Sequence, residues 1–477
     1  MGYLEIYRIF VPELRKQSLC KGINTADKKE KNNMKKLMTL AAFLAGALGA
    51  NAEMWTLREC IDYALEHNIT INKNRVLQET GESNLAQYKS QLWPSLTFST
   101  MQNVTYRPLQ DDITTRTVDG QVTISSNKVT GNSNYNLAMN WTVWNGGVNY
   151  LNVRNQRITN KIAEQTTETS EKTIQEQITQ FYVQILFSKE AEAVNERLAE
   201  TARRQWERGQ EMMNQGQMSR ADVVQLEAQK AAAEYNIVAA KTQTANYRRQ
   251  LKRLLQLDLN EEFDVESPVP ADDAAMADIP SAQEVYAEAL ASRPEIRGAE
   301  LGVEQAELAY NIAKRGFYPT ISVSANVGDS HNTANDNSVG DQLRTNLSGS
   351  AGVNISVPLW DQRKTKTAKE KARQQMTTAR LDLADKRQTL SSSIGQFWLN
   401  ATSNQQRFVS AQAKLKSQEE SYRLVDEQFH NGLKNVVDVL EARDNMLSAE
   451  QTKLESKYNT ILNSALLRFY MGEDIDL

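Results

Sequence analysis

Long stretches of this 477-residue chain contain no residue that would interrupt a helix. Residues 148–208 include neither Gly nor Pro, and residues 217–267 and 433–471 are equally uninterrupted. At 1.5 Å per residue, a helix over the first of these runs would be about 90 Å long, which is far beyond the helices of a globular domain. The sequence therefore predicts an elongated bundle of long helices.

The last of these runs also has a seven-residue apolar period. Leu440, Leu447, Leu454 and Ile461 follow one another at the spacing of a coiled-coil seam. Ordinary core packing in a shorter helix would give the same local pattern. The length of the runs favours helices that lie along one another.

The second half of the chain repeats the first. A shift of 225 residues aligns Pro94 with Pro319, and a shift of 216 aligns Trp144 with Trp360. The segment between Pro and Trp is longer in the first copy, as expected where a loop varies in length. Each copy reads as a helix, a strand, a loop, a strand and two long helices joined by a turn.

The duplication divides the chain into domains. We expect one repeat over residues 53–257 and a second over residues 281–477. Residues 258–280 between them are rich in Asp, Glu and Pro and contain no Lys or Arg, which is typical of a linker. We expect this linker to pack around the middle of the helical bundle and not to bind a ligand.

We expect the first 52 residues to be absent from the mature protein. Met34-Lys35-Lys36 is a short basic region that precedes an apolar run, and Ala50-Asn51-Ala52 has the form of a signal-peptidase site. Residues 34–52 are therefore expected to be a secretory signal peptide, because the apolar run is too short for a membrane anchor. Residues 1–33 would result from a misassigned upstream start, and the mature chain would begin at Glu53.

The composition argues against several classes of function. With 2 Cys and 3 His, the chain has little material for a zinc site or a histidine-based acid–base centre. A net charge of −4 is opposite in sign to that of a typical nucleic-acid binder. No phosphate-binding loop, catalytic triad or carboxylate pair is recognisable. We expect no enzymatic activity, no cofactor, no metal site and no nucleic-acid partner.

Four short segments have a period of two residues, which indicates strands. Apolar residues alternate with Ser, Thr, Asn or Ala in residues 137–143, 321–327 and 353–357, and more weakly after Ser95. A face of small polar residues behind an apolar face suits a water-filled lumen within a lipid-facing wall. Trp141 and Val323 are expected to face lipid. Their neighbours Asn140 and Ser324 are expected to face the lumen, and the polar loops 107–136 and 329–345 to face the cell exterior.

An aromatic residue marks each of the four boundaries between a strand and a helix. These residues are Trp93, Trp144, Tyr318 and Trp360. Aromatic rings at one level are favoured at a membrane interface, because the ring is apolar while its polar group stays hydrated. Caps on the end of a helical bundle would give the same positions.

Four strands cannot close a barrel. An open sheet edge in lipid would leave backbone groups unpaired, at a cost of several kcal/mol each. The smallest closed barrels have about eight strands. The strands therefore require at least two copies of the chain, and the pattern does not fix the number.

Several short motifs stand at the ends of the expected strands and helices. They are the sequences Leu92-Trp93-Pro94-Ser95-Leu96, Trp144-Asn145-Gly146-Gly147, Leu359-Trp360-Asp361, Phe429-His430-Asn431-Gly432 and residues 437–442, together with Asn68 in the helix before the first strand. Together they resemble the TolC-type outer-membrane efflux proteins. None of them is decisive alone. Their order and duplication across residues 55–470 make the resemblance specific.

The resemblance implies a mainly α fold with a small β part. Three copies would form a homotrimer, in which twelve strands make one barrel in the lipid of the outer membrane and the helices make a periplasmic tunnel. The family docks a periplasmic adaptor and an inner-membrane pump of the RND or ABC type, and exports drugs, metals or proteins.

The resemblance also implies a gate at the periplasmic tip. The helix turns at Gly216 and Gly432 would form the tips and the adaptor-docking surface; a Gly there permits the left-handed backbone that ends a helix. The family's gate positions correspond to Phe429, Lys434, Asp438 and Glu441, with Asp222 as an acidic partner. The chain has Phe for Tyr, Lys for Arg and Glu for one Asp. Because Phe cannot hydrogen-bond and Lys lacks the bidentate geometry of Arg, the closed state is expected to be held less tightly.

Two alternatives to an export channel remain open. A periplasmic coiled-coil scaffold would explain the helices, but it leaves the alternating strands and their aromatic boundaries unexplained. An enzyme is disfavoured because no reactive group of residues is visible. Without the resemblance, the gate residues would be ordinary solvated charges at helix ends.

Overall fold

The computed structural model describes residues 54–109, 117–118, 121–122, 128–258, 260–335 and 337–475. The expected upstream segment, signal peptide and mature start at Glu53 lie outside these residues. Among the described residues, Met54 and residues 262–264 belong to a small compact unit, and all the others belong to a large one. Every helix of the described chain lies in the large unit.

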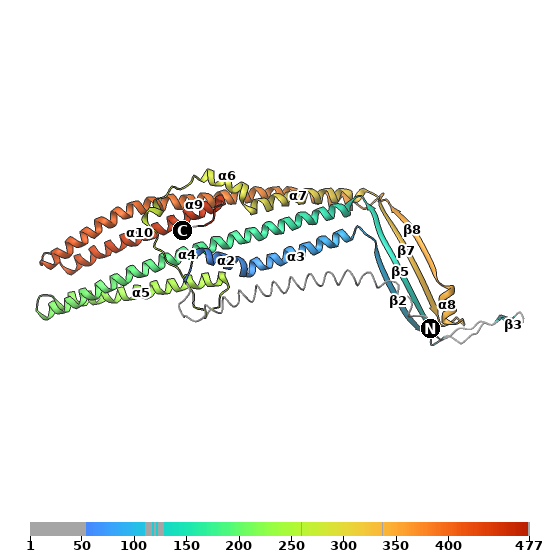
Figure 1. The fold of residues 1–477 in the computed structure, drawn as a ribbon, viewed down its shortest axis with the longest axis horizontal. Helices are drawn as coiled ribbons and strands as arrows, with labels where there is room; N and C mark the ends of the chain where they lie inside the picture. Colours follow the sequence, from blue (N-terminus) through green and yellow to red (C-terminus); the bar gives the residue numbers. More distant parts are fainter. Residues whose placement is uncertain are drawn as a thin grey trace, which may run out of the picture. The chain divides into compact units, whose positions relative to one another are not determined.

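The large unit contains two copies of one series of elements (Figure 1). The first copy consists of α2 (Leu57–His67), α3 (Ile69–Ser90), β2 (Ser95–Tyr106), β5 (Val129–Asn145), α4 (Val148–Asn214) and α5 (Arg220–Leu255). The second consists of α6 (Ala282–Ser292), α7 (Pro294–Lys314), β7 (Thr320–Asn332), β8 (Ser348–Ser356), α9 (Lys364–His430) and α10 (Val436–Met471). The mainly α fold with a small β part is confirmed.

Shorter elements complete the described chain. They are β1 (Met54–Trp55), β3 (Thr117–Val118), β4 (Gln121–Val122), β6 (Asp264–Val265), η2 (Asp272–Met276), η3 (Arg315–Phe317) and α8 (Val339–Thr345). No helix within the described residues is both long enough and apolar enough to span a membrane.

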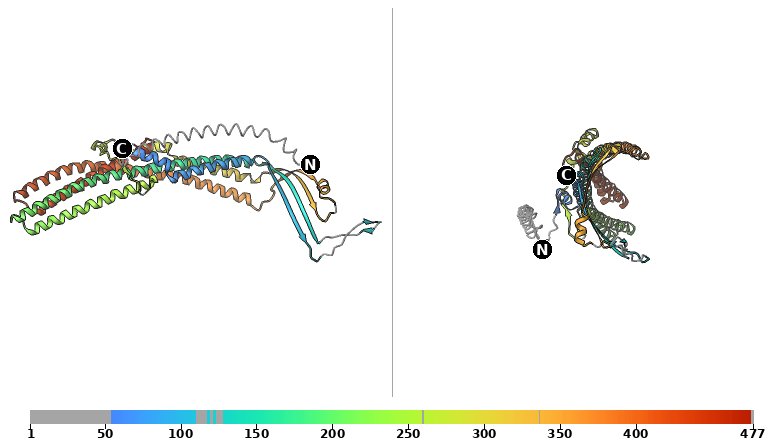
Figure 2. Two further views of the ribbon diagram at one scale, coloured as in Figure 1. Left: turned by 60° about the horizontal axis from the view of Figure 1, so that its bottom comes forward. Right: turned by 90° about the vertical axis from the view of Figure 1, so that its right-hand side faces the viewer.

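The long helices form two antiparallel hairpins, α4 with α5 and α9 with α10 (Figures 1 and 2). Both α4 and α9 contain 67 residues, and both α5 and α10 contain 36. Each hairpin turns at a glycine with a positive φ of 71°, Gly216 in the first and Gly432 in the second. A side chain at either glycine would be strained, which explains the residue at each turn.

Helix α4 continues beyond the run that is free of Gly and Pro, through Gly209. A Cβ atom at this position would lie 2.6 Å from the Leu226 side chain of α5. Glycine costs about 1 kcal/mol relative to Ala in a helix interior. Here it allows α5 to pack closely against α4 near the turn.

One antiparallel sheet joins the two copies in the order β2-β5-β7-β8. Strands β2 and β8 form its two edges. The end view in Figure 2 shows this sheet as a curved arc. The described strands of one chain therefore leave the barrel open, as expected for a barrel that is shared between chains.

The strand register places most of the apolar residues of the four strands on one face. Phe98 lies opposite Leu137, which lies opposite Val327. Val323 lies between Trp141 on one side and Val353 on the other. The apolar residues of the edge strands remain exposed in the single chain; Phe98 is 65% exposed and Val353 67%. No other layer of the described chain covers the apolar part of this face.

A register shift changes the face of one aromatic residue. The pairing of β5 with β7 is irregular between Thr142 and Trp144, and Trp144 lies opposite Ile321. Strict alternation from Trp141 would put Trp144 on the polar face. The bulge moves it to the apolar face, because one extra residue reverses the alternation beyond it.

The strands extend further than the sequence pattern indicated. β5 begins at Val129 and β7 ends at Asn332, so the ends of both expected loops are strand. Helix α8 lies within the second loop. The amide of Gln342, which is 1% exposed, donates to the carbonyl oxygens of Asn335 (3.2 Å) and Asn337 (2.9 Å) and fixes this segment.

The two copies differ at the break between their first two helices. In the first, the buried Asn68 accepts hydrogen bonds from the amide of Thr70 and donates to the carbonyl oxygen of Leu254, 3.0 Å away. Its counterpart Arg293 instead pairs with Glu295 at 2.9 Å and lies 4.0 Å from the ring centroid of Tyr470. A polar helix cap is thus replaced by a cation–π contact.

Cys60 is fully buried in α2, and burial raises the pKa of its thiol to about 12. Because the thiolate is the reactive form, we expect native protein to resist a thiol reagent at pH 8 and denatured protein to react at once. Labelling of the full chain followed by mass spectrometry measures this. Rapid labelling of Cys60 in the native protein would contradict the described packing of α2.

The inter-repeat segment packs against the second hairpin. Asp272 accepts from Lys453 Nζ at 2.8 Å and from Lys457 Nζ at 3.0 Å. Ala275 is fully buried in a cluster with Phe408 of α9 and Ile461 of α10. These contacts fasten η2 to both helices of the hairpin.

The hydrogen bond from Lys453, and with it Lys457, holds the pKa of Asp272 below its usual range. A lowered carboxyl pKa in the folded state contributes stability above the ordinary carboxyl pKa. That contribution is lost as the pH falls through the lowered value. We therefore expect the amides of residues 272–277 to lose hydrogen-exchange protection on acidification. Asp272→Asn should show weaker protection at pH 7 and little further loss; an unchanged profile would contradict the role of Asp272.

Candidate functional site

The tips of the two hairpins are built by equivalent helix caps. Ser219 caps α5: its hydroxyl accepts from the amide of Asp222 at 3.2 Å and donates to the Asp222 carboxylate at 2.7 Å. Asn435 caps α10 in a reciprocal arrangement with Asp438, with bonds of 2.9 and 3.1 Å. Both carboxylates lie in the first turn of a helix, where the helix dipole favours negative charge.

Lys434 lies in the turn between α9 and α10, and its partner within the chain is Asp438. Lys434 Nζ is 3.4 Å from Asp438 Oδ1, and both side chains are partly exposed. Such a pair contributes only ~0.2–1 kcal/mol. Glu441 is exposed one turn further along α10. The expected pairing of Lys434 with Asp222 of a neighbouring hairpin stays a prediction.

Phe429 packs between the two hairpins. It contacts a cluster of the buried side chains Leu226, Val436 and Leu440, together with the partly buried Trp206 and Met218. These residues come from both hairpins. At this position, therefore, an apolar contact joins the two tips of one chain.

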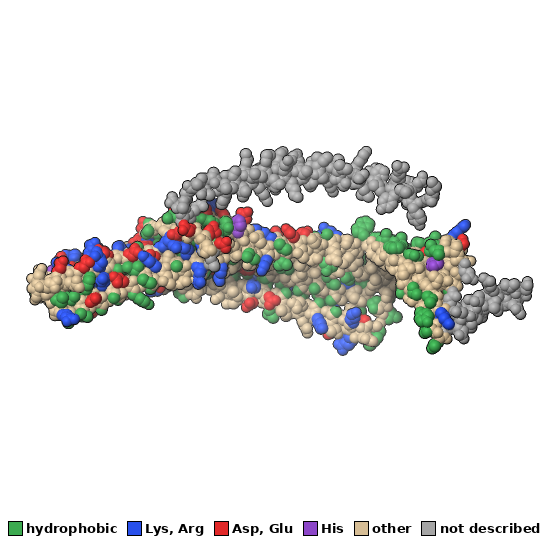
Figure 3. Space-filling view, turned by 90° about the horizontal axis from the view of Figure 1, so that it is seen from below, with side chains coloured by type: hydrophobic (Ala, Val, Ile, Leu, Met, Phe, Trp, Pro, Cys, Tyr) green, Lys and Arg blue, Asp and Glu red, His purple; other side chains and the backbone are tan. Residues whose placement is uncertain are grey.

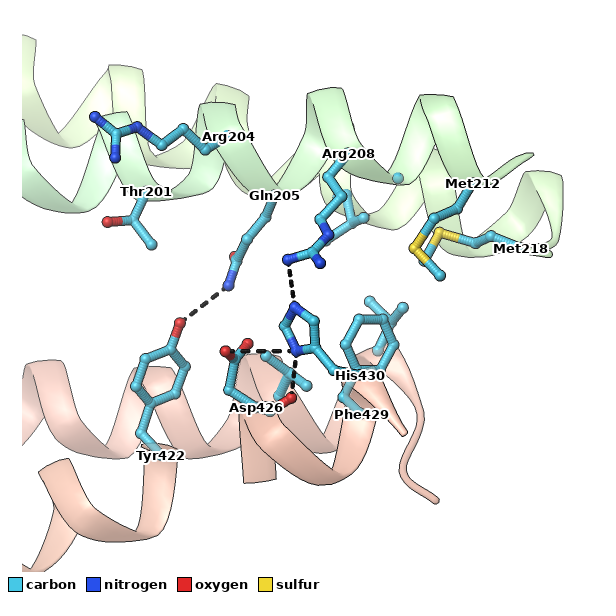
Figure 4. A pocket seen from close by; sticks show the side chains of 14 residues that line it. Thr201, Arg204, Gln205, Arg208, Met212, Met218, Tyr422, Asp426, Phe429 and His430 are labelled. Atoms are coloured by element: carbon cyan, nitrogen blue, oxygen red, sulfur yellow. Dashed lines mark hydrogen bonds and ion pairs between the residues drawn. The ribbon is translucent and has the colours of Figure 1, made fainter. Parts of the chain in front are cut away.

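Polar contacts also cross between the hairpins at this level (Figure 4). Gln205 Nε2 donates to the hydroxyl of Tyr422 at 3.0 Å, and Arg208 contacts His430 Nε2. His430 Nδ1 lies 2.6 Å from the backbone oxygen of Asp426 in its own helix. Burial raises the pKa of Tyr422 above its ordinary value.

A third polar contact lies further from the turns. The buried Arg443 of α10 donates to Gln229 Oε1 of α5 at 2.6 Å and to its neighbour Asp444 at 3.1 Å. Sequence reasoning missed Arg443, Arg208 and Tyr422. His430 stood within a motif that the resemblance used, but no role was assigned to it.

A cleft of about 210 Å³ lies between the tips. Its walls include the apolar Met212, Met218 and Phe429 and the polar Arg204, Arg208 and His430. Met212 and Met218 extend toward each other beside Phe429 in Figure 4. Throughout the part of the chain that the structure describes, His, Cys, Asp and Glu do not gather in a group of three that could hold a metal ion.

The four boundary aromatics lie where the sheet meets the helices. Trp93 precedes β2 and Trp360 follows β8, and they are 73% and 83% exposed. Trp144 near the end of β5 and Tyr318 before β7 are each 42% exposed. Trp141 Nε1 donates to the backbone oxygen of Leu92 at 2.9 Å, which ties β5 to the end of α3. Hydrophobic side chains are spread over the surface of this end in Figure 3.

Comparison with known proteins gives matches over nearly the whole described chain. Residues 60–256 and 285–473 match the outer membrane efflux protein family. The chain is 23% identical over 449 residues to the outer membrane efflux protein BepC of Brucella suis, covering 91% of this chain and 89% of BepC. It is 23% identical over 278 residues to the alkaline protease secretion protein AprF of Pseudomonas aeruginosa, covering 57% of this chain. That match spans 55% of the length of AprF.

The fold is also similar to solved structures. The outer membrane protein VceC from Vibrio cholerae superposes with a TM-score of 0.72 at 15% sequence identity. The superposition covers 88% of this chain and 97% of VceC. The likeness in fold therefore includes both repeats.

Proposed function

Because the chain belongs to the outer membrane efflux protein family, we propose that three copies of it form the outer-membrane channel of an efflux or secretion system. The family's members are outer-membrane channel components of such systems. In this proposal the sheets of three chains close one twelve-stranded barrel in the outer membrane. The hairpins form a tunnel through the periplasm, and cargo enters at the tips.

The main support for this proposal is the arrangement of the four-stranded sheet. Its two edges, β2 and β8, are unpaired within the described chain, and one of its faces is apolar across all four strands. Pairing β8 of one chain with β2 of the next would satisfy both edges. It would also turn the apolar face toward lipid and the Ser, Thr and Asn face toward water.

The proposal also assigns roles to the two repeats, to the hairpin turns and to the partner proteins. The repeats 53–257 and 281–477, with the linker 258–280, are two structural units of one tunnel wall. The turns at Gly216 and Gly432 meet a periplasmic adaptor, which links the channel to an inner-membrane pump of the RND or ABC type. AprF is a secretion protein and BepC an efflux protein, which supports either kind of system.

Cell fractionation tests the proposal against a periplasmic coiled-coil scaffold. A channel stays in the outer membrane after washing with concentrated salt, whereas a scaffold held by polar contacts is released. Recovery of the full chain in the wash would overturn the channel. Retention that needs detergent for extraction would support it, since only buried apolar surface resists salt.

The charges at the tips form the gate of this channel. Asp438 and Glu441 of three chains contribute six carboxylates at the narrowest point, and Asp222 of a neighbouring hairpin competes with Asp438 for Lys434. Phe429 packs the hairpins of each chain together behind these charges. Because an exposed pair with Lys434 is weak, an adaptor that binds the same helices can open the tip.

We expect Lys434→Ala to raise the single-channel conductance of the purified full chain in planar bilayers. The substitution removes the contact by which Lys434 would hold neighbouring tips together, and it leaves the Asn435–Asp438 cap intact. Lys434→Arg is the matched control and should conduct no more than the wild type. Equal currents from all three proteins would place the constriction elsewhere.

A further inference from the structure

The polar face of the sheet has an asparagine at successive levels. Near its outer end, three asparagines lie directly opposite one another: Asn103 of β2, Asn132 of β5 and Asn332 of β7. Their shared register puts the three amides side by side on one face. An amide offers two donor hydrogens and an acceptor oxygen, so it can bond water, cations or anions.

The same pattern continues along the strands toward the helices. The following transverse rows each contain one asparagine: Ser99–Asn136–Gly328–Ser348, Thr97–Ala138–Asn326–Ser350, Ser95–Asn140–Ser324–Gly352 and Thr142–Ser322–Asn354. Hydroxyls, amides and small residues fill the positions between them. Within a row, Ser350 Oγ donates to Asn326 Oδ1 at 2.9 Å, so neighbouring groups also hold one another.

Charge is excluded from this face over the paired residues of β2, β5, β7 and β8. The face consists of Ser, Thr, Asn and Gly, apart from Met101 and Ala138, and none of these paired positions is Asp, Glu, Lys or Arg. The one carboxylate in the paired strands, Asp329, lies opposite Tyr135. By alternation it belongs to the other face, near the outer end of the sheet.

We infer that this polar face is an amide-lined wall that passes hydrated solutes regardless of the sign of their charge. The inference rests on the proposed function, which turns the face toward the lumen. Pores discriminate between cations and anions through rings of fixed charge that focus the field. An amide wall has no such ring. Along the paired strands the channel then does not select by charge, and in the proposed gate the carboxylates of Asp438 and Glu441 do.

The wall also limits the class of cargo that it can select. Exposed amides and hydroxyls exchange hydrogen bonds with water and with polar cargo of any charge, and they offer no apolar surface to hold a drug-like ring. The barrel is therefore a conduit for cationic, anionic and neutral polar solutes alike.

Reversal potentials of the purified full chain in planar bilayers, under a tenfold KCl gradient, test this inference. A tip-neutral variant, Asp438→Asn with Glu441→Gln, should have a cation-to-anion permeability ratio of about 1. Asn at 438 retains an oxygen acceptor for the Asn435 cap. Adding Asn140→Asp should restore cation selectivity, and adding Asn140→Lys should produce anion selectivity. Adding Asn140→Gln, which keeps the amide, should change nothing.

The possible results distinguish a failure of this inference from a failure of the proposed channel function on which it rests. Strong selectivity between cations and anions that persists in the tip-neutral variant would overturn the inference. Fixed charges elsewhere in the pore would then be responsible for it. Identical reversal potentials with Asp, Lys and Gln at position 140 would also overturn it, because this face would not line the lumen. In both cases a conducting channel remains. Failure of every variant and of the wild type to conduct would instead overturn the proposed function.

Discussion

Val323→Arg should prevent the chain from assembling in the outer membrane. Val323 lies between Trp141 and Val353 on the face proposed to contact lipid. An Arg within the lipid-facing band of a barrel costs about 2–4 kcal/mol near the midplane, and three chains would each contribute one. The amount of folded protein recovered from the outer-membrane fraction measures the effect, and we expect it to fall by more than about tenfold.

Ser324→Arg is the matched control for this prediction. Ser324 is the next residue of β7, is exposed, and lies on the opposite face beside Asn140. An Arg there would extend into the water-filled lumen and should be tolerated in assembly. If both variants reach the outer membrane in equal amounts, the assignment of the two faces is wrong.

Phe408→Ala should strongly destabilise the second hairpin. The Phe408 ring is fully buried between Ala275 of the inter-repeat segment and Ile461 of α10. Removal of a fully buried Phe side chain costs about 3–5 kcal/mol, from lost burial and from the cavity that remains. Chemical denaturation of the detergent-solubilised protein, at a fixed protein concentration, measures the loss of unfolding free energy.

Val409→Ala serves as the control on the same helix. Val409 follows Phe408 in α9 and is 51% exposed in the single chain. Its truncation removes less buried surface, so the unfolding free energy should change by less than about 1 kcal/mol. A loss as large as that of Phe408→Ala would show that burial of the Phe408 ring is not what stabilises the hairpin.

The long helices and the duplication could be predicted from the sequence because their signals are local. The absence of Gly and Pro shows where a helix can run, and a constant shift relates whole elements. That absence does not fix where a helix ends, because α5 stops at Leu255 although the run without Gly or Pro continues to residue 267. The shift of 216 relates Val148 to Lys364 at the start of α4 and α9, and Asn214 to His430 at their ends. The shift of 225 likewise relates Ile69 to Pro294 at the start of α3 and α7.

The details of the sheet were less predictable because register depends on the partner strand. The bulge that puts Trp144 opposite Ile321 is created by the pairing of β5 with β7, and neither sequence alone indicates it. The extent of β5 was underestimated for the same reason. Residues 129–136 are rich in polar residues and resemble a loop, yet they pair with β2 on one side, and residues 132–136 also pair with β7 on the other.

At the tips, sequence reasoning found the carboxylates and missed the contacts between hairpins. Asp222 and Asp438 were found through the resemblance, and the structure adds that each follows a capping residue by three positions. Arg208 and His430 are 222 positions apart, and Gln205 and Tyr422 are 217 apart, so no local pattern connects them. The role of the carboxylates as a gate stays a prediction.

Disulfide cross-linking of the two sheet edges tests the shared barrel most directly. In a Cys60→Ala background, Ser99→Cys in β2 is combined in turn with a Cys at each position from 348 to 355 in β8, and the chain is oxidised in isolated outer membranes. Only thiols whose Cα atoms lie within about 7 Å can be joined. We expect at least one of these β8 positions to give covalently linked dimers and trimers of the chain. No larger species should form, because three sheets close the ring and leave no free edge. A ladder that continues beyond three chains, or no cross-link at any position, would contradict the trimeric barrel.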